Sequence, residues 1–544
     1  MSHRTLSALL CLVLLAAPAT VSAQQDNTSA SKQGKRDFRD EFEKFKKQTR
    51  KDYDDFRKKC LADYAKFVRE AWKEFGAEPP IPVPEEPKVK PMLAPHADAQ
   101  TASWFSRLFG KKSKSEKNAK AERKQLEQAK QQQEQPKPAV KKTSDQLTIE
   151  EIIAFRPAPP KPEPLSEVIE QPESRNEYYE FSVFGAKCRV RMGSDCRVNL
   201  KSISENDVAD AIEQFQKGQF DNMLYDCLQE RKRHNFSDWA YYQMLRALTD
   251  GFYGKHTNEG TLVMAFLYSQ SGYKMRLAHD GTNLYMLVAS PHTIYDKSYY
   301  FICADCDWYY LLDGPKNESL SVCQAAFPKE SPLSLQITAV QDFGQSEGTE
   351  RTITSEFNDE FSFTVKSNQN CIDFYGTYPS SYVDGNFMTR WAMYANTPLE
   401  KGLTAQLYPQ IRQKIAGMSP LEAVQQLLWW VQTGLEYKFD EEVWGDDRAF
   451  FGEESIFYPY CDCEDRSILL SHLVRDLLGL DVVLVYYPGH LAMAVNFPEE
   501  VEGDYYLYQG RKFTVCDPTY IRAYVGETMP TVKDTPTTLI LLER

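Results

Sequence analysis

The sequence predicts an α+β protein built from several units, with the chemistry in its C-terminal domain. Helical segments with capping signals alternate with short β-branched runs in two stretches, residues 176–318 and 401–544. The hydrophobic content of 42%, together with 31 tyrosines, is enough to form buried cores. A length of 544 residues is too great for one core, so we expect about three or four units.

Charge divides the chain into two unlike parts. The formal net charge is −13, but residues 1–146 carry 30 basic and 20 acidic side chains, and the remainder carries 34 and 57. A nucleic-acid-binding protein needs a basic footprint, so no nucleic-acid partner is expected. The acidic C-terminal part favours a substrate with a neutral or basic surface.

Residues 1–23 have the pattern of a secretory signal peptide. Arg4 provides the positive charge, residues 8–17 form a short apolar run, and residues 21–23 offer a cleavage site. The run is too short to span a bilayer, so we expect a secreted or periplasmic protein. Of the 12 cysteines, all but Cys11 lie beyond this peptide, so at least one thiol stays unpaired within the chain.

Residues 24–76 are expected to form a charged amphipathic helix with an eleven-residue repeat. Phe42, Tyr53, Tyr64 and Phe75 follow this spacing, and most residues between them are charged. Eleven residues complete three helical turns, so the aromatic stripe stays on one face. The helix could pack on its own protein or in a coiled coil. Alternatively, it could contact a membrane or envelope surface peripherally.

Residues 77–175 have the composition of a linker. Five prolines between residues 79 and 87 break the helix, a Lys/Gln-rich run follows at 111–135, and further prolines continue to residue 172. Such a sequence is typical of a mostly disordered tether.

Residues 401–544 contain the clearest helix signals. Ser419, followed by Pro420 and Glu422, is expected to cap a helix that runs to about Thr433. An apolar helix should follow and end at Gly479. The expected strands after it are residues 481–486, 491–495 and 513–516.

Three residues in these elements form a candidate catalytic set. Cys463 lies at the start of the apolar helix, with Asp462 placed as its N-cap. The free N–H groups at a helix start favour a thiolate, so we expect a lowered pKa for this thiol. His490 begins one strand and Asp517 ends another. Together they would supply a nucleophile, a base and a carboxylate that orients the base.

The sequence indicates the oxyanion donors of this site less specifically than the catalytic set. The backbone N–H of Cys463 would be one oxyanion donor, and a side chain from the preceding loop, Tyr458 or Tyr460, could be the second. Metal binding is the competing interpretation, but a Cys-x-Cys pair lacks the usual zinc spacing. Its ligands would be Cys461, Cys463, His472 and His490.

The chain resembles the transglutaminase-like superfamily, as an exported bacterial member. The matching motifs are Cys-x-Asp-x-Ser at 463–467, Gly-His at 489–490 and Asp-Pro-Thr at 517–519, within residues 401–544. The resemblance implies a papain-like domain with Cys463, His490 and Asp517 as nucleophile, base and orienting residue. His490 departs from many relatives in being followed by Leu-Ala, and Cys461 adds a thiol that could pair with Cys463. The family includes cross-linkers, peptidases, amidases and inactive copies, so it does not fix the reaction.

Residues 176–318 are expected to be a degenerate copy of the same domain. Both stretches have a helix, an apolar helix ending at a glycine, and three strands at similar spacings. Counting from Gly272 places His256 and Asn283 where the nucleophile and base belong, with Asp313 retained. The copy would therefore lack covalent chemistry. Between the two units, residues 319–400 are expected to be β-rich, with strands at 333–340 and 361–365.

Two functions remain in competition from sequence alone. The first is an exported cysteine-dependent amide hydrolase or acyl transferase, a peptidase or amidase acting on a protein or peptide without cofactor or metal. Hydrolysis is favoured because nothing marks a second amine site, and no Asp-x-Asp-x-Asp-Gly calcium loop is visible. The alternative is a non-catalytic scaffold that binds protein or glycan at the cell envelope.

Overall fold

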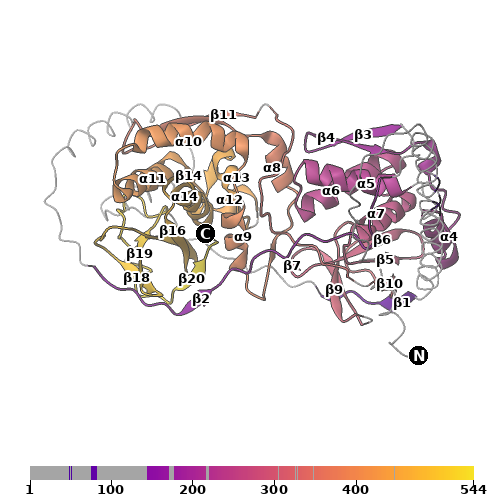
Figure 1. Cartoon of the computed structure of the whole chain (residues 1–544). Helices are drawn as coiled ribbons and strands as arrows, with labels where there is room; N and C mark the ends of the chain where they lie inside the picture. The colour runs from indigo at the N-terminus through magenta and orange to yellow at the C-terminus, as the bar shows by residue number, and fades with distance from the viewer. Residues whose placement is uncertain are drawn as a thin grey trace, which may run out of the picture. The chain divides into compact units, whose positions relative to one another are not determined.

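The protein is an α+β structure, as expected, and it is seen here in a computed structural model (Figure 1). It describes residues 75–82, 144–170, 177–215, 220–303, 305–324, 326–327, 329–346, 348–445 and 447–543, besides Lys44, Gln48 and Lys51. All the elements below belong to one compact unit, residues 65–544. The signal peptide and nearly all of the aromatic-striped helix lie outside the described residues, but the helix prediction is wrong at its end, because Phe75 and Gly76 belong to a β-strand. None of the helices in the described ranges is both long and apolar enough to cross a membrane.

The first of two six-stranded sheets has the strand order β8-β9-β6-β5-β10-β1. Its strands are β1 (Phe75–Glu78), β5 (Met275–His279), β6 (Leu284–Ala289), β8 (Ser298–Ile302), β9 (Asp307–Leu311) and β10 (Leu320–Cys323). The hairpin β3 (Tyr178–Val183) and β4 (Ala186–Arg191), with a short 3₁₀ helix at Ser194–Cys196, precedes the helices. These are α4 (Glu205–Phe215), α5 (Asp221–Arg233), α6 (Asp238–Tyr253) and α7 (Asn258–Gln270).

The second sheet has the order β18-β19-β17-β16-β20-β2. Its strands are β2 (Glu151–Ile153), β16 (Asp481–Tyr487), β17 (His490–Asn496), β18 (Tyr505–Tyr508), β19 (Arg511–Cys516) and β20 (Thr538–Leu541). The helices of this part are α10 (Lys401–Ile415), α11 (Pro420–Gly434), α12 (Asp440–Val443), α13 (Gly452–Phe457) and α14 (Cys463–Leu478). Two short strands, β14 (Glu436–Tyr437) and β15 (Tyr460–Cys461), form a separate parallel pair.

The two principal helices of the C-terminal part begin and end where the sequence predicts. Ser419 and Glu422 form the reciprocal capping box of α11, and Pro420 is its first residue. Helix α14 ends at Gly479, whose positive φ of 66° closes the last turn in the left-handed conformation. The predicted strands at 481–486, 491–495 and 513–516 are confirmed as β16, β17 and β19.

The two sheets share one succession of elements. In each, a pair of packed helices (α6 and α7, or α11 and α14) precedes two antiparallel strands, a hairpin and a further strand. The strand orders correspond position by position, from β8 and β18 at one edge to β1 and β2 at the other. Only the edge strand differs, because β1 runs antiparallel to β10 whereas β2 runs parallel to β20. Duplication of the domain stays a prediction, and the shared strand order is a condition that a duplication must meet.

The prediction of a β-rich segment at residues 319–400 is confirmed only in part. β10 belongs to the first sheet, and residues 333–340 contain no strand. The predicted strand at 361–365 is confirmed as β12 (Ser362–Lys366), which pairs with β11 (Glu350–Thr354). The other elements are α8 (Gln369–Tyr375) and α9 (Thr389–Asn396), besides β13 (Ser381–Tyr382), which pairs with β7 (Thr293–Ile294). Both helices are short, with seven and eight residues, and a helical period is hard to recognise over about two turns.

The linker prediction is also wrong for the described residues between 77 and 175. Extended chain at Phe75–Glu78 and Glu151–Ile153 supplies an edge strand to each sheet. Leu147 is buried in the core of the second sheet, and the Lys161 ammonium donates to the Phe236 carbonyl at 3.2 Å. Proline-rich chain is already extended, and at a sheet edge one side of the backbone needs no partner strand.

Gly272 lies where this extended chain approaches the part of the protein built on the first sheet, which we call the first domain. Its φ is +92°, and a Cβ there would clash with the backbone carbonyl of Glu163. Gly281 has a similar φ of +95° but nothing within 4 Å of its Cβ position. We expect Gly272→Ala to lower the free energy of unfolding by about 2 kcal/mol more than Gly281→Ala does. Urea denaturation of both variants measures this difference, and equal losses would show that residues 159–166 do not pack here.

Candidate functional site

Cys463 is the first residue of α14, and Asp462 alone separates it from strand β15. The thiol is 1% exposed, and the backbone N–H of Leu491 interacts with its sulfur. The Ser467 hydroxyl, one turn along the helix, donates to the Leu491 carbonyl at 3.0 Å. These two contacts attach the start of α14 to the start of β17, so the nucleophile candidate lies beside the strand that carries His490.

His490 and Asp517 form a buried pair. The His490 Nε2 atom lies 2.9 Å from Asp517 Oδ2, and both side chains are at most 1% exposed. The other oxygen, Asp517 Oδ1, accepts the backbone N–H groups of Thr519 at 2.9 Å and Tyr520 at 3.1 Å. The Asp-Pro-Thr motif thus fixes its own carboxylate. The remaining ring nitrogen, His490 Nδ1, is buried and has no hydrogen-bond partner.

The thiol environment differs from the sequence expectation. Burial raises the pKa of Cys463 well above its usual value, and the carboxylates of Glu464 and Asp462 raise it further. The thiol donates to Glu464 Oε2 at 3.2 Å. The predicted lowering is wrong because two adjacent carboxylates and desolvation outweigh the modest charge of a helix N-terminus.

Two other residues of the Cys-x-Asp-x-Ser stretch hold the backbone around the thiol. Asp465 accepts the N–H of Phe450 at 2.8 Å and that of Asp462 at 3.1 Å. Asp462 is the N-cap of α14 and takes part in a capping box with Asp465. Arg466 is 1% exposed and donates to three backbone carbonyls, those of Gln432, Leu435 and Pro518.

The two tyrosines considered as oxyanion donors have other neighbours. The Tyr458 ring lies 5.3 Å from the Arg448 guanidinium carbon, and Lys438 Nζ lies 3.4 Å from the centre of the Tyr460 ring. Tyr437 is instead the tyrosine on which the charge of Cys463 acts. Burial raises its pKa well above the usual value, and the charge of Cys463 adds to this. It lies on β14, outside every motif in the sequence, which is why pattern analysis missed it.

The second thiol points elsewhere. The Cys461 thiol donates a hydrogen bond to the Glu436 carbonyl oxygen, with Sγ 3.8 Å from that oxygen. Neither Cys461 nor Cys463 forms a disulfide in the structure. Within the described residues, three clusters of side chains are close enough together to share a metal ion. None of them contains Cys461 or His472, two of the four ligands that the metal-binding interpretation requires.

The corresponding position of the first domain holds an asparagine. Helix α7 begins at Asn258, so Asn258 and not His256 occupies the place of Cys463, and the prediction of His256 is wrong. The Asn258 Oδ1 atom accepts the backbone N–H of Leu284 at 2.8 Å, which is the counterpart of the Cys463–Leu491 contact. Asn283 bonds to Asp280, and Asp313 accepts from Tyr242 at 2.5 Å. Counting back from the glycine at the helix end placed His256 there wrongly, because α7 has 13 residues whereas α14 has 16.

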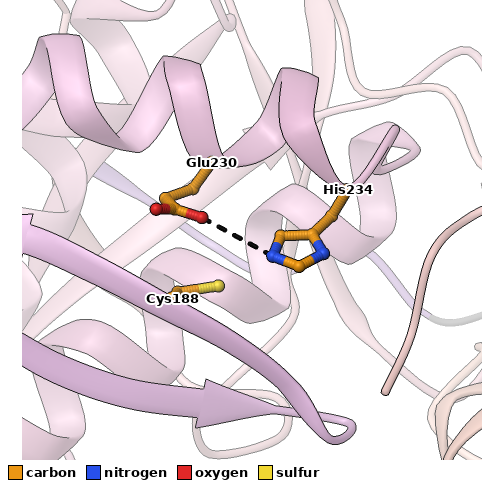
Figure 2. A group of neighbouring side chains, drawn as sticks. All are labelled: Cys188, Glu230 and His234. Carbon is orange, nitrogen blue, oxygen red and sulfur yellow. Dashed lines mark ion pairs between the residues drawn. The ribbon is translucent and has the colours of Figure 1, made fainter. Parts of the chain in front are cut away.

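Another cluster of chemically capable side chains lies in the first domain (Figure 2). Cys188 on β4 faces Glu230 and His234, from the end of α5, and their ligand atoms lie within 4.8 Å of one another. Glu230 already accepts Arg233 Nε at 2.8 Å, and the His234 nitrogens lie 3.0 Å and 3.2 Å from backbone carbonyls. Glu230 and His234 are thus fully engaged in an ion-pair network that attaches β4 to α5, and we assign this cluster a structural role.

Comparisons of the chain with protein-family models, curated proteins and solved structures found no match.

Proposed function

We propose that the protein is a transglutaminase-like cysteine amide hydrolase or acyl transferase, of peptidase or amidase type. The observation that carries the proposal is the arrangement at the start of β17. Asp517 forms a hydrogen bond with Nε2 of His490, and the Nδ1 atom of the same ring has no hydrogen-bond partner. The Cys463 sulfur contacts the backbone N–H of Leu491, the residue after His490. The candidates for nucleophile, base and orienting group thus belong to adjoining elements: the first residue of α14, the first residue of β17 and the residue directly after β19.

The geometry supports a specific division of roles. The Asp517 carboxylate accepts the Nε2 proton, which leaves the lone pair on Nδ1 of His490. This nitrogen takes the thiol proton as the Cys463 sulfur attacks the amide carbonyl, and returns it to the amine that leaves. The acyl group stays on sulfur until water attacks it, with His490 again as the base. An amine in place of water would give cross-linking by the same steps.

The substrate is proposed to be a protein or peptide outside the cytoplasm. This part of the proposal rests on the signal-peptide pattern of residues 1–23 and on the acidic character of the C-terminal part. The aromatic-striped segment would hold the enzyme at an envelope surface. The first domain, with Asn258 in place of a thiol, would be a non-catalytic copy.

The alternative is a non-catalytic scaffold, and one observation favours it. All three side chains of the set are at most 1% exposed, and the raised pKa of Cys463 keeps its thiol protonated. An enzyme with this site must open it to admit a substrate.

Alkylation by iodoacetamide under mild reduction separates the two functions. We expect the full-length protein to be labelled at Cys463, and His490→Ala to slow this labelling by at least about 100-fold, because proton transfer by a positioned base contributes that much. Cys461→Ala is the matched control, since its thiol faces Glu436, and it should keep the wild-type rate. The exposed Cys303 and Cys306 serve as internal standards in the same mass-spectrometric digest.

The catalytic proposal fails on any of three results. Cys463 could stay unlabelled while Cys303 and Cys306 react, it could be recovered in a disulfide with Cys461, or His490→Ala could leave its rate unchanged.

A further inference from the structure

The turn between β8 and β9, in the first domain, carries two cysteines three residues apart. Ile302 and Asp307 are the last paired residues of the two strands, so Cys303 and Cys306 begin and end the turn between them. Both side chains are exposed, and neither forms a disulfide in the structure, whereas the other cysteines of the described ranges are buried. Among the described residues, this turn is therefore where thiols meet solvent.

The turn brings the two cysteines within disulfide range. The first and fourth residues of a β-turn lie less than about 7 Å apart between their Cα atoms, and a disulfide spans about 4.4–6.8 Å. The Cys306 thiol donates to the Cys303 carbonyl oxygen, with Sγ 3.4 Å from that oxygen. One sulfur thus already lies against the residue that carries the other.

Two aspartates attach the turn to the body of the first domain. Asp305 Oδ2 accepts the Arg276 guanidinium at 2.6 Å, and Asp307 Oδ2 accepts the Lys274 ammonium at 2.6 Å. Arg276 is 1% exposed, so the turn is tied to a buried anchor. Because the backbone is already ordered, little further entropy is lost when the two sulfurs pair.

Cys306 has a backbone conformation that cysteine does not favour. Its φ is +53°, in the left-handed region where glycine and asparagine are the common residues. A cross-link between residues three apart adds little stability, because the loop that it closes is already small. Neither backbone preference nor stability thus accounts for a thiol at this position, which points to its chemistry.

We propose that Cys303 and Cys306 form an exposed, reversible disulfide by exchange with a low-molecular-weight organic disulfide. One thiolate attacks a sulfur of that disulfide, whose S–S bond breaks, and the leaving thiolate takes up a proton. The second cysteine then attacks the mixed disulfide and releases a second thiol. In sum, the two cysteines lose two electrons and two protons, and the organic disulfide is reduced to two thiols. A small disulfide needs only exposed sulfur, whereas a protein disulfide would also need a docking surface.

This pair is independent of the proposed hydrolase. It does not involve Cys463, so either proposal can fail while the other holds. The expected export of the chain would place the pair where disulfides persist. An exposed disulfide is readily reduced, so mild reduction returns both residues to thiols, as the alkylation experiment above requires.

The test equilibrates the full-length protein in buffers of glutathione and glutathione disulfide, and then blocks the remaining thiols with acid and an alkylating agent. Trypsin releases both cysteines in one peptide, residues 298–316, because no lysine or arginine lies between its ends. As the buffer becomes more oxidising, we expect this peptide to lose two hydrogens and both alkylation sites. Reduced glutathione should reverse the change.

The single variants Cys303→Ser and Cys306→Ser show whether the two sulfurs act together. Each should accumulate a glutathione adduct, at a level at least about tenfold above that in the wild type, because intramolecular attack has a millimolar effective concentration over so short a span. Serine at 306 can still donate to the Cys303 carbonyl, so this variant keeps the contact in the turn. Cys371→Ser, which removes a buried thiol, is the control and should titrate as the wild type does.

Three results would overturn the proposal. Both cysteines could remain thiols in the most oxidising buffer, or each could take up glutathione in the wild type without joining the other. The third is a disulfide that reduced glutathione does not reopen, which would show a structural cross-link instead of an exchanging pair.

Discussion

Replacing Asp517 with asparagine is expected to slow alkylation of Cys463, and any amide hydrolysis, by on the order of 10⁴-fold while the fold is retained. The asparagine oxygen can still accept the N–H groups of Thr519 and Tyr520, which bind Oδ1 now. Its amide nitrogen, however, would donate to Nε2 of His490 at the position of Oδ2. The imidazole would then carry its proton on Nδ1, where it cannot accept the thiol proton.

The matched control is Asp313→Asn in the first domain. Asp313 occupies the corresponding place in sequence but bonds to Tyr242 and Arg246 on α6, so it should leave the Cys463 rate unchanged. Alkylation rates are measured by mass spectrometry, and the native fold is checked by circular dichroism. If Asp517→Asn labels at the wild-type rate, the pair of His490 and Asp517 is only structural.

The second large effect is on stability, and it is expected from Arg466→Met. The guanidinium lies 3.2 Å from the Gln432 carbonyl, 2.5 Å from that of Leu435 and 3.4 Å from that of Pro518. Methionine fills a similar volume but leaves all three buried acceptors unpaired, each at a cost of roughly 1–3 kcal/mol. We expect the free energy of unfolding to fall by about 4 kcal/mol in urea denaturation.

Arg412→Met is the control for this measurement. Arg412 is exposed on α10 and lies over the Tyr408 ring at 5.7 Å, so its loss should change stability by about 0.5 kcal/mol or less. Arg466→Lys should fall between the two, because an ammonium can reach one carbonyl but not three in different directions. A loss below about 1 kcal/mol for Arg466→Met would mean that other groups hold the three segments together.

Local signals predicted the C-terminal elements well. Ser419 and Gly479 mark helix ends by short-range chemistry, namely a side-chain cap and a left-handed residue, and both were found in place. Strands β16, β17 and β19 are β-branched or apolar runs that follow the glycine in order. The sequence order of Cys463, His490 and Asp517 also carried enough information to expect them on one helix and two strands.

Long-range contacts could not be predicted in the same way. The pairing of residues 75–78 with β10, and of 151–153 with β20, depends on partners hundreds of residues away. The pKa of Cys463 depends on desolvation, which a helix-end argument does not contain. The charge of Cys463 acts on Tyr437, which lies on β14 and pairs with β15 across an intervening loop, and one residue type at one position gives no indication of such an arrangement.

The edge strands have a consequence for the order of assembly. Synthesis starts at the N-terminus, so β1 exists long before β10, and β2 long before β20. Gln324 contacts Glu78 across 246 residues, and Lys533 pairs with Asp145 across 388. The backbone of β1 and that of β2 therefore stay without their partner strands until almost the whole of the corresponding domain has been synthesised. The last strand, residues 538–541, completes the second sheet, so loss of the C-terminal end would also release residues 151–153 from the sheet edge.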